Sequence, residues 1–200
     1  MTIKAIKAMQ GCEVVIYAGS LINKEVLKYA MPQAEIYDSS AMNLDEIVDV
    51  MLKAHGEGKN VARLHTGDPT IYGAIQEQIV RLKGQGVKYE IIPGVSSFLA
   101  AAAVLKKELT VPEITQTVII TRIGGRTKVS PKQEIGSLAK HNATMAIFLS
   151  VQEIDRVVGE LLSGYDQDTP VAVVYKATWE DQAIIMGRLD NISDKVRSRG

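Results

Sequence analysis

The sequence has few of the residues that mark secreted or membrane proteins. It contains a single cysteine, Cys12, which excludes a disulfide within the chain and is typical of a reducing cytosol. The longest apolar run, residues 98–105, is far shorter than the roughly 20 residues that span a bilayer. The N-terminal segment lacks the apolar core of a signal peptide. These absences predict a soluble, cytoplasmic protein without a membrane partner.

Neither charge sign is in excess, because 23 lysines and arginines balance 23 aspartates and glutamates. This balance gives no indication of a nucleic-acid partner. The histidines, His55, His65 and His141, are too scattered for a recognised metal motif, so we expect no metal. The chain also lacks a Walker-type phosphate loop, a Gly-x-Gly-x-x-Gly fingerprint and a serine nucleophile elbow. These residue patterns alone therefore indicate no more than a ligand-binding protein, with an enzyme as one alternative.

Apolar strand-like runs alternate with amphipathic helical segments, which is the pattern of an α/β protein with a mostly parallel sheet. We expect strands at residues 14–17, 61–64, 89–92, 117–121, 144–149, 170–175 and 183–186. We expect helices at residues 44–55, 71–82, 96–105, 131–140 and 153–162, the first opened by a capping box of Asn43 and Glu46. The polar, proline-containing stretch 106–116 suggests a linker. The pattern therefore predicts two α/β lobes, residues 1–113 and 114–200, with a cleft between them.

Two turns that follow predicted strands are candidates for ligand binding, because small ligands bind at the carboxyl ends of strands in α/β folds. In the first, Gly67 permits a tight turn beside Asp68, and Tyr72 follows one turn later. In the second, Ser96 and Ser97 stand where a helix begins. Each feature has a purely structural alternative, since aspartate and serine are both preferred helix N-caps and Tyr72 could simply pack in the core.

A third candidate is the loop at residues 121–128, where a strand is followed by two glycines and three cations, Arg122, Arg126 and Lys128. Arginine forks match carboxylates in two-point contacts, so the loop suits a ligand with several negative charges. The alternative is an ordinary solvated loop.

Five motifs occur in a fixed order along nearly the whole chain: residues 14–22, 65–69, 72–74, 93–97 and 175–179. Together they resemble the tetrapyrrole methylase family of S-adenosylmethionine-dependent enzymes. The Gly-Asp-Pro and Pro-Gly-Val-Ser-Ser turns are shared widely across that family. The resemblance implies an α/β fold made of two lobes of tetrapyrrole methylase type, with S-adenosyl-L-methionine in the cleft between them, and a homodimer.

The resemblance also implies the residues that contact the cofactor and the substrate. The cofactor positions are Gly67, Asp68, Ile71, Tyr72, Ser96, Ser97, Leu149 and Ala177. Since corrin precursors carry acetate and propionate arms, Arg122, Arg126 and Lys128 become candidate carboxylate clamps. No catalytic residue is implied, because an activated methyl group needs mainly alignment and exclusion of water.

Narrower stretches, residues 108–112, 115–122 and 125–127, resemble the branch of the family that methylates C11 of a corrin precursor in cobalamin synthesis, with or without cobalt in the substrate. Alternatives are a methyltransferase for another tetrapyrrole or of diphthine type, and a non-catalytic dimer that binds S-adenosylmethionine. Family members begin with a further strand and a glycine-rich loop and end with a further strand, neither of which is in this sequence. We therefore expect an unpaired apolar edge in the first lobe.

Overall fold

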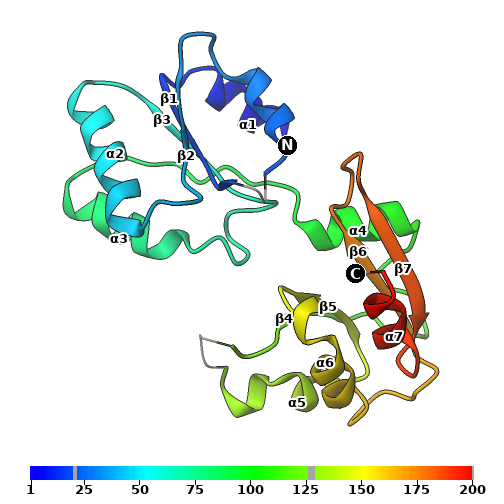
Figure 1. Cartoon of the computed structure of the whole chain (residues 1–200). Helices are drawn as coiled ribbons and strands as arrows, with labels where there is room; N and C mark the ends of the chain where they lie inside the picture. The colour runs from blue at the N-terminus through cyan, green and yellow to red at the C-terminus, as the bar shows by residue number, and fades with distance from the viewer. Residues whose placement is uncertain (20–21, 126–128, 200) are drawn as a thin grey trace. The chain divides into compact units, whose positions relative to one another are not determined.

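The computed structural model describes residues 1–19, 22–125 and 129–199. By their contacts the residues form two compact units, Met1–Leu99 and Ala100–Gly200. Both units combine helices with strands, which confirms the α/β class (Figure 1). The division between the units falls within α4 (Ser97–Leu105), whereas the composition changes near residue 113.

The first unit is built on a parallel sheet of three strands in the order β2-β1-β3. The strands are β1 (Val14–Tyr17), β2 (Glu35–Asp38) and β3 (Val61–Leu64). All four residues of β1 are buried, as expected of a central strand with both faces covered. Figure 1 places α2 (Leu44–Gly56) and α3 (Ile75–Gly84) on one side of this sheet and α1 (Ile3–Met9) on the other.

Helix α2 begins as the sequence predicts. The Asn43 side chain accepts a hydrogen bond from the Glu46 backbone N–H, and the Glu46 carboxylate accepts one from the Asn43 N–H. This capping box satisfies two backbone donors that the first turn leaves free. The helix then packs its apolar face on β1, in a core made of Val14, Ile16, Ile47, Met51 and Ala54.

Two predictions for the first unit are wrong. The first is the strand predicted at residues 89–92, which form no strand. Among the described strands β3 therefore pairs only with β1, and its other edge is unpaired. A strand requires a hydrogen-bonded neighbour, which extended chain alone does not supply. Helix α3 begins at Ile75 instead of Ile71, because Tyr72 and Ala74 have left-handed φ values of 54° and 50° that interrupt a right-handed helix.

The second unit contains two separate two-stranded sheets. The parallel pair is β4 (Val118–Arg122) and β5 (Thr144–Phe148), and the antiparallel pair is β6 (Pro170–Tyr175) and β7 (Ala183–Arg188). The helices are α5 (Ile135–Ala139), α6 (Ile154–Leu161) and α7 (Ile192–Arg197). The core joins α5 and α6 through Ile135, Ala139, Val157 and Leu161.

Short helical segments account for most of the remaining differences from prediction. The helix expected at 131–140 is a 3-10 turn, η3 (Pro131–Gln133), followed by α5. The sequence did not predict η2 (Lys24–Tyr29), η4 (Val151–Glu153) or α7. None of the described helices is both long enough and apolar enough to cross a membrane.

Candidate functional site

The carboxyl ends of the first sheet carry a network of polar contacts. The Tyr17 hydroxyl, at the end of β1, donates to the Asp38 carboxylate at the end of β2 over 2.8 Å. Asp38 also accepts a hydrogen bond from the Ser40 backbone N–H. That bond, with those from the Ser40 and Tyr17 side chains, lowers the pKa of Asp38. The network fixes the carboxyl ends of these strands, which is where α/β proteins bind ligands.

Asp68 joins the two turns that the sequence singles out. One carboxylate oxygen accepts from the backbone N–H of Thr70 at 2.9 Å and from the Thr70 hydroxyl. The other accepts from the backbone N–H of Gly94 at 2.8 Å, in the second turn. Bonds from Thr70 first, and then from Gly94, lower the pKa of Asp68. Asp68 therefore connects the turns and caps no α-helix, since α3 begins only at Ile75.

The two turns lie in direct backbone contact. A Cβ atom added to Gly67 would lie 3.2 Å from Ser96 Cα and 3.3 Å from the Ser97 nitrogen. A Cβ atom added to Gly94 would lie 1.9 Å from the Gly67 carbonyl oxygen. Gly67 also has a φ of +67°, which favours glycine. The structure thus brings together Gly67, Asp68, Ser96 and Ser97 from segments far apart in sequence.

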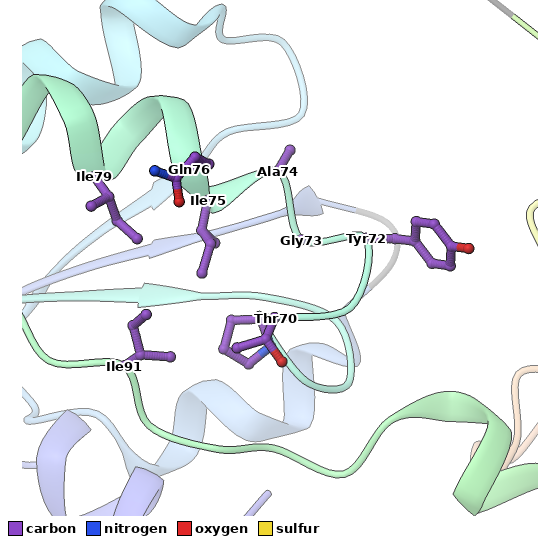
Figure 2. Close-up of a pocket in the computed structure, with 9 residues that line it drawn as sticks. Thr70, Tyr72, Gly73, Ala74, Ile75, Gln76, Ile79 and Ile91 are labelled. Carbon is purple, nitrogen blue, oxygen red and sulfur yellow. The ribbon is translucent and has the colours of Figure 1, made fainter. Parts of the chain in front are cut away.

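A pocket of about 370 Å³ lies beside the first turn. In Figure 2 the side chains of Ile75 and Ile79 on α3 point toward Ile91, whereas the Tyr72 ring points away from the pocket. Thr70 adds a hydroxyl to this largely apolar lining. Its size and lining suit part of a small organic ligand.

In the second unit, Ser150 joins the ends of the parallel strands. Its hydroxyl accepts from the Ile123 backbone N–H at 2.9 Å and donates to the Phe148 carbonyl at 2.6 Å. Arg122 pairs in register with Phe148, so it lies beside Leu149 at the same end of the sheet. Leu149 is 71% exposed and has a left-handed φ of 53°.

The cationic loop is anchored by a residue that sequence reasoning missed. Arg156 on α6 donates to the Gly124 carbonyl at 3.1 Å and pairs with Glu153 and Glu160. Two of the predicted clamp residues, Arg126 and Lys128, lie outside the described residues. Arg122 is described and half-buried.

The turn between β6 and β7 holds another predicted position, Ala177, and the predicted position Ile71 lies in the turn before α3. The neighbours of Ala177, Lys176 and Thr178, both have left-handed φ values, 47° and 72°. The Lys176 ammonium lies 5.1 Å from the Tyr175 ring centre and 5.0 Å from that of Trp179, and it pairs with Asp181. Backbone in sparsely populated conformations concentrates at ligand sites in proteins, and here it flanks the predicted contacts.

His65 is the histidine nearest in sequence to the first turn. Burial, reinforced by the nearby positive charge of Arg63, lowers its pKa to about 4. His65 is therefore neutral at physiological pH. Among the described residues no three histidine, cysteine, aspartate or glutamate side chains group together as metal ligands.

Sequence reasoning missed several polar residues in the strands or close to their carboxyl ends: Tyr17, Asp38, Ser150, Arg156 and Arg63. Tyr17 and Ser150 stand at or just after strand ends, and this position is a signal that could have indicated them. The partners of Arg156 depend on tertiary packing, which spacing alone does not reveal.

The sequence matches the family described as Tetrapyrrole (Corrin/Porphyrin) Methylases over residues 1–193. It is 57% identical to the cobalt-precorrin-4 C(11)-methyltransferase of Methanocaldococcus jannaschii, over 100% of this chain and 78% of that protein. An X-ray structure of a cobalt precorrin-4 methyltransferase matches with a TM-score of 0.96 at 46% identity, over 100% of this chain and 84% of that one.

A relative that acts on another substrate is much less similar. The uroporphyrinogen-III C-methyltransferase of the same organism, M. jannaschii, is 32% identical, over 98% of this chain and 84% of that protein. The sequence is therefore more similar to the cobalt-precorrin-4 enzyme of M. jannaschii than to the uroporphyrinogen-III enzyme of the same organism.

Replacing Asp68 tests the connection between the turns. In Asp68→Asn the amide nitrogen cannot accept from the Gly94 N–H, so we expect the free energy of unfolding to fall by roughly 2 kcal/mol at pH 7. Because folding lowers the pKa of Asp68, its contribution is present above the unfolded pKa, near 4, and is lost as the pH falls through the folded pKa. Urea unfolding of both proteins at pH 7 and at pH 3 measures this difference.

Asp49→Asn is the matched control, since Asp49 is exposed in the middle of α2. An equal effect of both substitutions, or a difference at Asp68 that does not shrink in acid, would contradict this role for Asp68.

Proposed function

The chain belongs to the family of tetrapyrrole (corrin/porphyrin) methylases, and we propose that it transfers a methyl group from S-adenosylmethionine to C11 of cobalt-precorrin-4 in cobalamin synthesis. The electron pair of C11 forms the new carbon–carbon bond, the bond between sulfur and the methyl carbon breaks, S-adenosylhomocysteine leaves, and one proton is released to water. Cobalt is part of the substrate and is not a ligand of the protein.

The observation that carries this proposal is the 57% identity, over the whole chain, to a protein named for C11 methylation. The 32% identity to the uroporphyrinogen-III enzyme of the same organism makes methylation of that other tetrapyrrole the weaker candidate. A diphthine-type enzyme and a non-catalytic module that binds S-adenosylmethionine are not favoured, because the high identity is to an enzyme of C11 methylation.

The residues of the first unit fit a nucleoside cofactor. Gly67 and Gly94 let two stretches of backbone approach each other closely, because no side chain stands between them. The neighbouring pocket combines the apolar residues Ile75 and Ile91 with the Thr70 hydroxyl. Gly67, Asp68, Ile71, Tyr72, Ser96 and Ser97 are proposed to hold the cofactor here, and Leu149 and Ala177 are proposed contacts from the second unit.

The chain promotes methyl transfer mainly by aligning the methyl donor with the substrate carbon and by excluding water. When bound, S-adenosylmethionine supplies a methyl group activated by its positively charged sulfur. Apolar side chains line much of the pocket, and Asp68 holds the two turns in register beside it. Such positioning lowers the barrier by removing freedom that the free reactants would have to lose. This account requires no side chain to act as an acid or a base.

Arg122, Arg126 and Lys128 are proposed to bind the acetate and propionate arms of the substrate. Arg122 ends β4 beside Leu149, a proposed cofactor position, so a clamp here would lie close to the reaction. Guanidinium groups bind carboxylates in two-point contacts that fix orientation as well as position.

The direct test is an assay with labelled methyl donor. The purified chain and cobalt-precorrin-4 should give a singly methylated product, with the new methyl group located at C11 by NMR spectroscopy. Uroporphyrinogen III, offered in the same way, should not be methylated. Methylation of uroporphyrinogen III alone, or binding of S-adenosylhomocysteine without any turnover, would contradict the proposal.

Substitution of Arg122 tests the clamp. Arg122→Met keeps the length of the side chain and removes its charge, so we expect KM for cobalt-precorrin-4 to rise by about tenfold, the effect of losing roughly 1.4 kcal/mol of binding. Affinity for S-adenosylhomocysteine, measured by calorimetry, should not change. Lys132→Met, an exposed cation of η3, is the control. An unchanged KM for the Arg122 variant would exclude the clamp.

We further propose that the enzyme is a cytoplasmic homodimer. The sequence of α4, Ser-Phe-Leu-Ala-Ala-Ala-Ala-Val-Leu, is almost entirely apolar, yet only Ala102 in it is buried. Leu99 is 49% exposed and the neighbouring Val95 is 48% exposed. Apolar surface of this kind is characteristic of a protein interface, and a second copy of the chain is its proposed partner.

Sedimentation equilibrium tests the homodimer. We expect the mass of two chains for the wild type and of one chain for Leu99→Asp, because a charge at this position would be buried in the interface. Val80→Asp, at a 58% exposed position of α3, should remain a dimer. A monomeric wild type, or a Leu99→Asp variant that stays dimeric, would contradict this interface.

A further inference from the structure

Arg63 in β3 has a guanidinium group with unused donors. Its Nε and Nη1 atoms are buried and have no hydrogen-bond partner among the described residues. Residues 20–21, 126–128 and 200, which are not among the described ones, contain no acidic side chain. No side-chain carboxylate of this chain is therefore available to pair with Arg63 in the described arrangement.

An unpaired, buried guanidinium is unfavourable in a folded protein. Arginine stays charged at any physiological pH, and buried donors are almost always hydrogen-bonded. Desolvation without a partner is costly, and burial lowers the pKa of Arg63 accordingly. An acceptor from outside the chain would remove this deficit. The planar fork of a guanidinium matches a carboxylate in particular.

The position of Arg63 points to a ligand as the source of that acceptor. Arg63 is the third residue of β3, and the chain passes from this strand into the turn that holds Gly67 and Asp68. The residue as a whole is partly exposed, whereas its Nε and Nη1 atoms are buried. The adjacent His65 is neutral, which leaves Arg63 as the positive charge of this pair.

We propose that Arg63 binds a carboxylate group of a ligand in the methyl-transfer site. The proposal rests on the function proposed above and adds a residue to it. Two ligands of that reaction carry such a group: the amino-acid end of S-adenosylmethionine, and the acetate and propionate arms of the tetrapyrrole. In either ligand, the carboxylate accepts hydrogen bonds from the guanidinium donors that have no acceptor among the described residues.

Calorimetric titration of the full chain distinguishes the two sources. The proteins are the wild type, Arg63→Met and Arg63→Lys. The probes are S-adenosylhomocysteine, 5′-methylthioadenosine, which lacks the carboxylate, and uroporphyrin III, a stable tetrapyrrole with acetate and propionate arms. We expect Arg63→Met to weaken binding of one carboxylate-bearing probe by about tenfold or more. Arg63→Lys should have an intermediate effect, because it keeps the charge but not the fork.

Each pattern of results has a defined meaning. Weaker binding of S-adenosylhomocysteine with unchanged binding of 5′-methylthioadenosine supports the cofactor carboxylate as the partner. Weaker binding of uroporphyrin III alone supports a substrate arm. Unchanged binding of all three probes, or equal losses for S-adenosylhomocysteine and 5′-methylthioadenosine, would overturn the proposal and leave Arg63 a structural role. A wild type that binds none of the probes would overturn this proposal and the proposed function together.

Folding is controlled separately. Arg81→Met is the matched variant, since Arg81 is exposed on α3 and pairs with Asp45 on α2, and it should bind all probes normally. Melting temperatures identify any variant that fails to fold. If Arg63→Met does not fold, Arg63→Lys decides: a loss confined to a carboxylate-bearing probe, at an unchanged melting temperature, supports the proposal, and unchanged affinities overturn it.

Discussion

The arrangement of the first unit depends on one carboxylate. Asp68 accepts hydrogen bonds from both turns at the carboxyl end of the sheet, and the two turns are distant in sequence. The contact is so close that glycine is required at position 94, where a side chain would overlap the Gly67 carbonyl. A residue that sequence alone presents as a possible helix cap is therefore the connection between two turns that are distant in sequence.

In the second unit a neutral hydroxyl likewise connects two segments of backbone. Ser150 both accepts and donates between the segments that follow β4 and β5. Arg156 then fixes Gly124 from the side of α6. In both units a buried or partly buried polar side chain satisfies backbone groups that strand pairing no longer reaches. The loops beyond the strand ends therefore keep a defined path without further strand pairing.

The sequence predicted what local chemistry determines. The capping box at Asn43 and the apolar runs of β1 and β3 lie where they were expected, because caps and hydrophobic periodicity act over a few residues. The prediction of a strand at 89–92 was wrong, because a strand needs a neighbouring strand to pair with, and no local pattern reveals whether one is present. The start of α3 was misplaced since Tyr72 and Ala74 adopt left-handed backbone that their identities do not favour. For the candidate site, the motifs singled out two turns that the structure brings into contact, but the bonds from Asp68 to both turns and the unpaired donors of Arg63 are visible only in three dimensions.

The left-handed backbone at Tyr72, Leu149, Lys176 and Thr178 has a consequence for the evolution of this enzyme. Each non-glycine residue in this conformation lowers the stability of the fold by about 1 kcal/mol. Glycine would relieve that strain at every one of these positions, yet it would also remove a side chain from a turn beside the proposed ligand contacts. Improvement of stability and retention of activity are therefore opposed at these turns. Heat-resistant variants that stay active should gain their stability elsewhere in the chain, whereas laboratory selection for stability alone would erode these turns first.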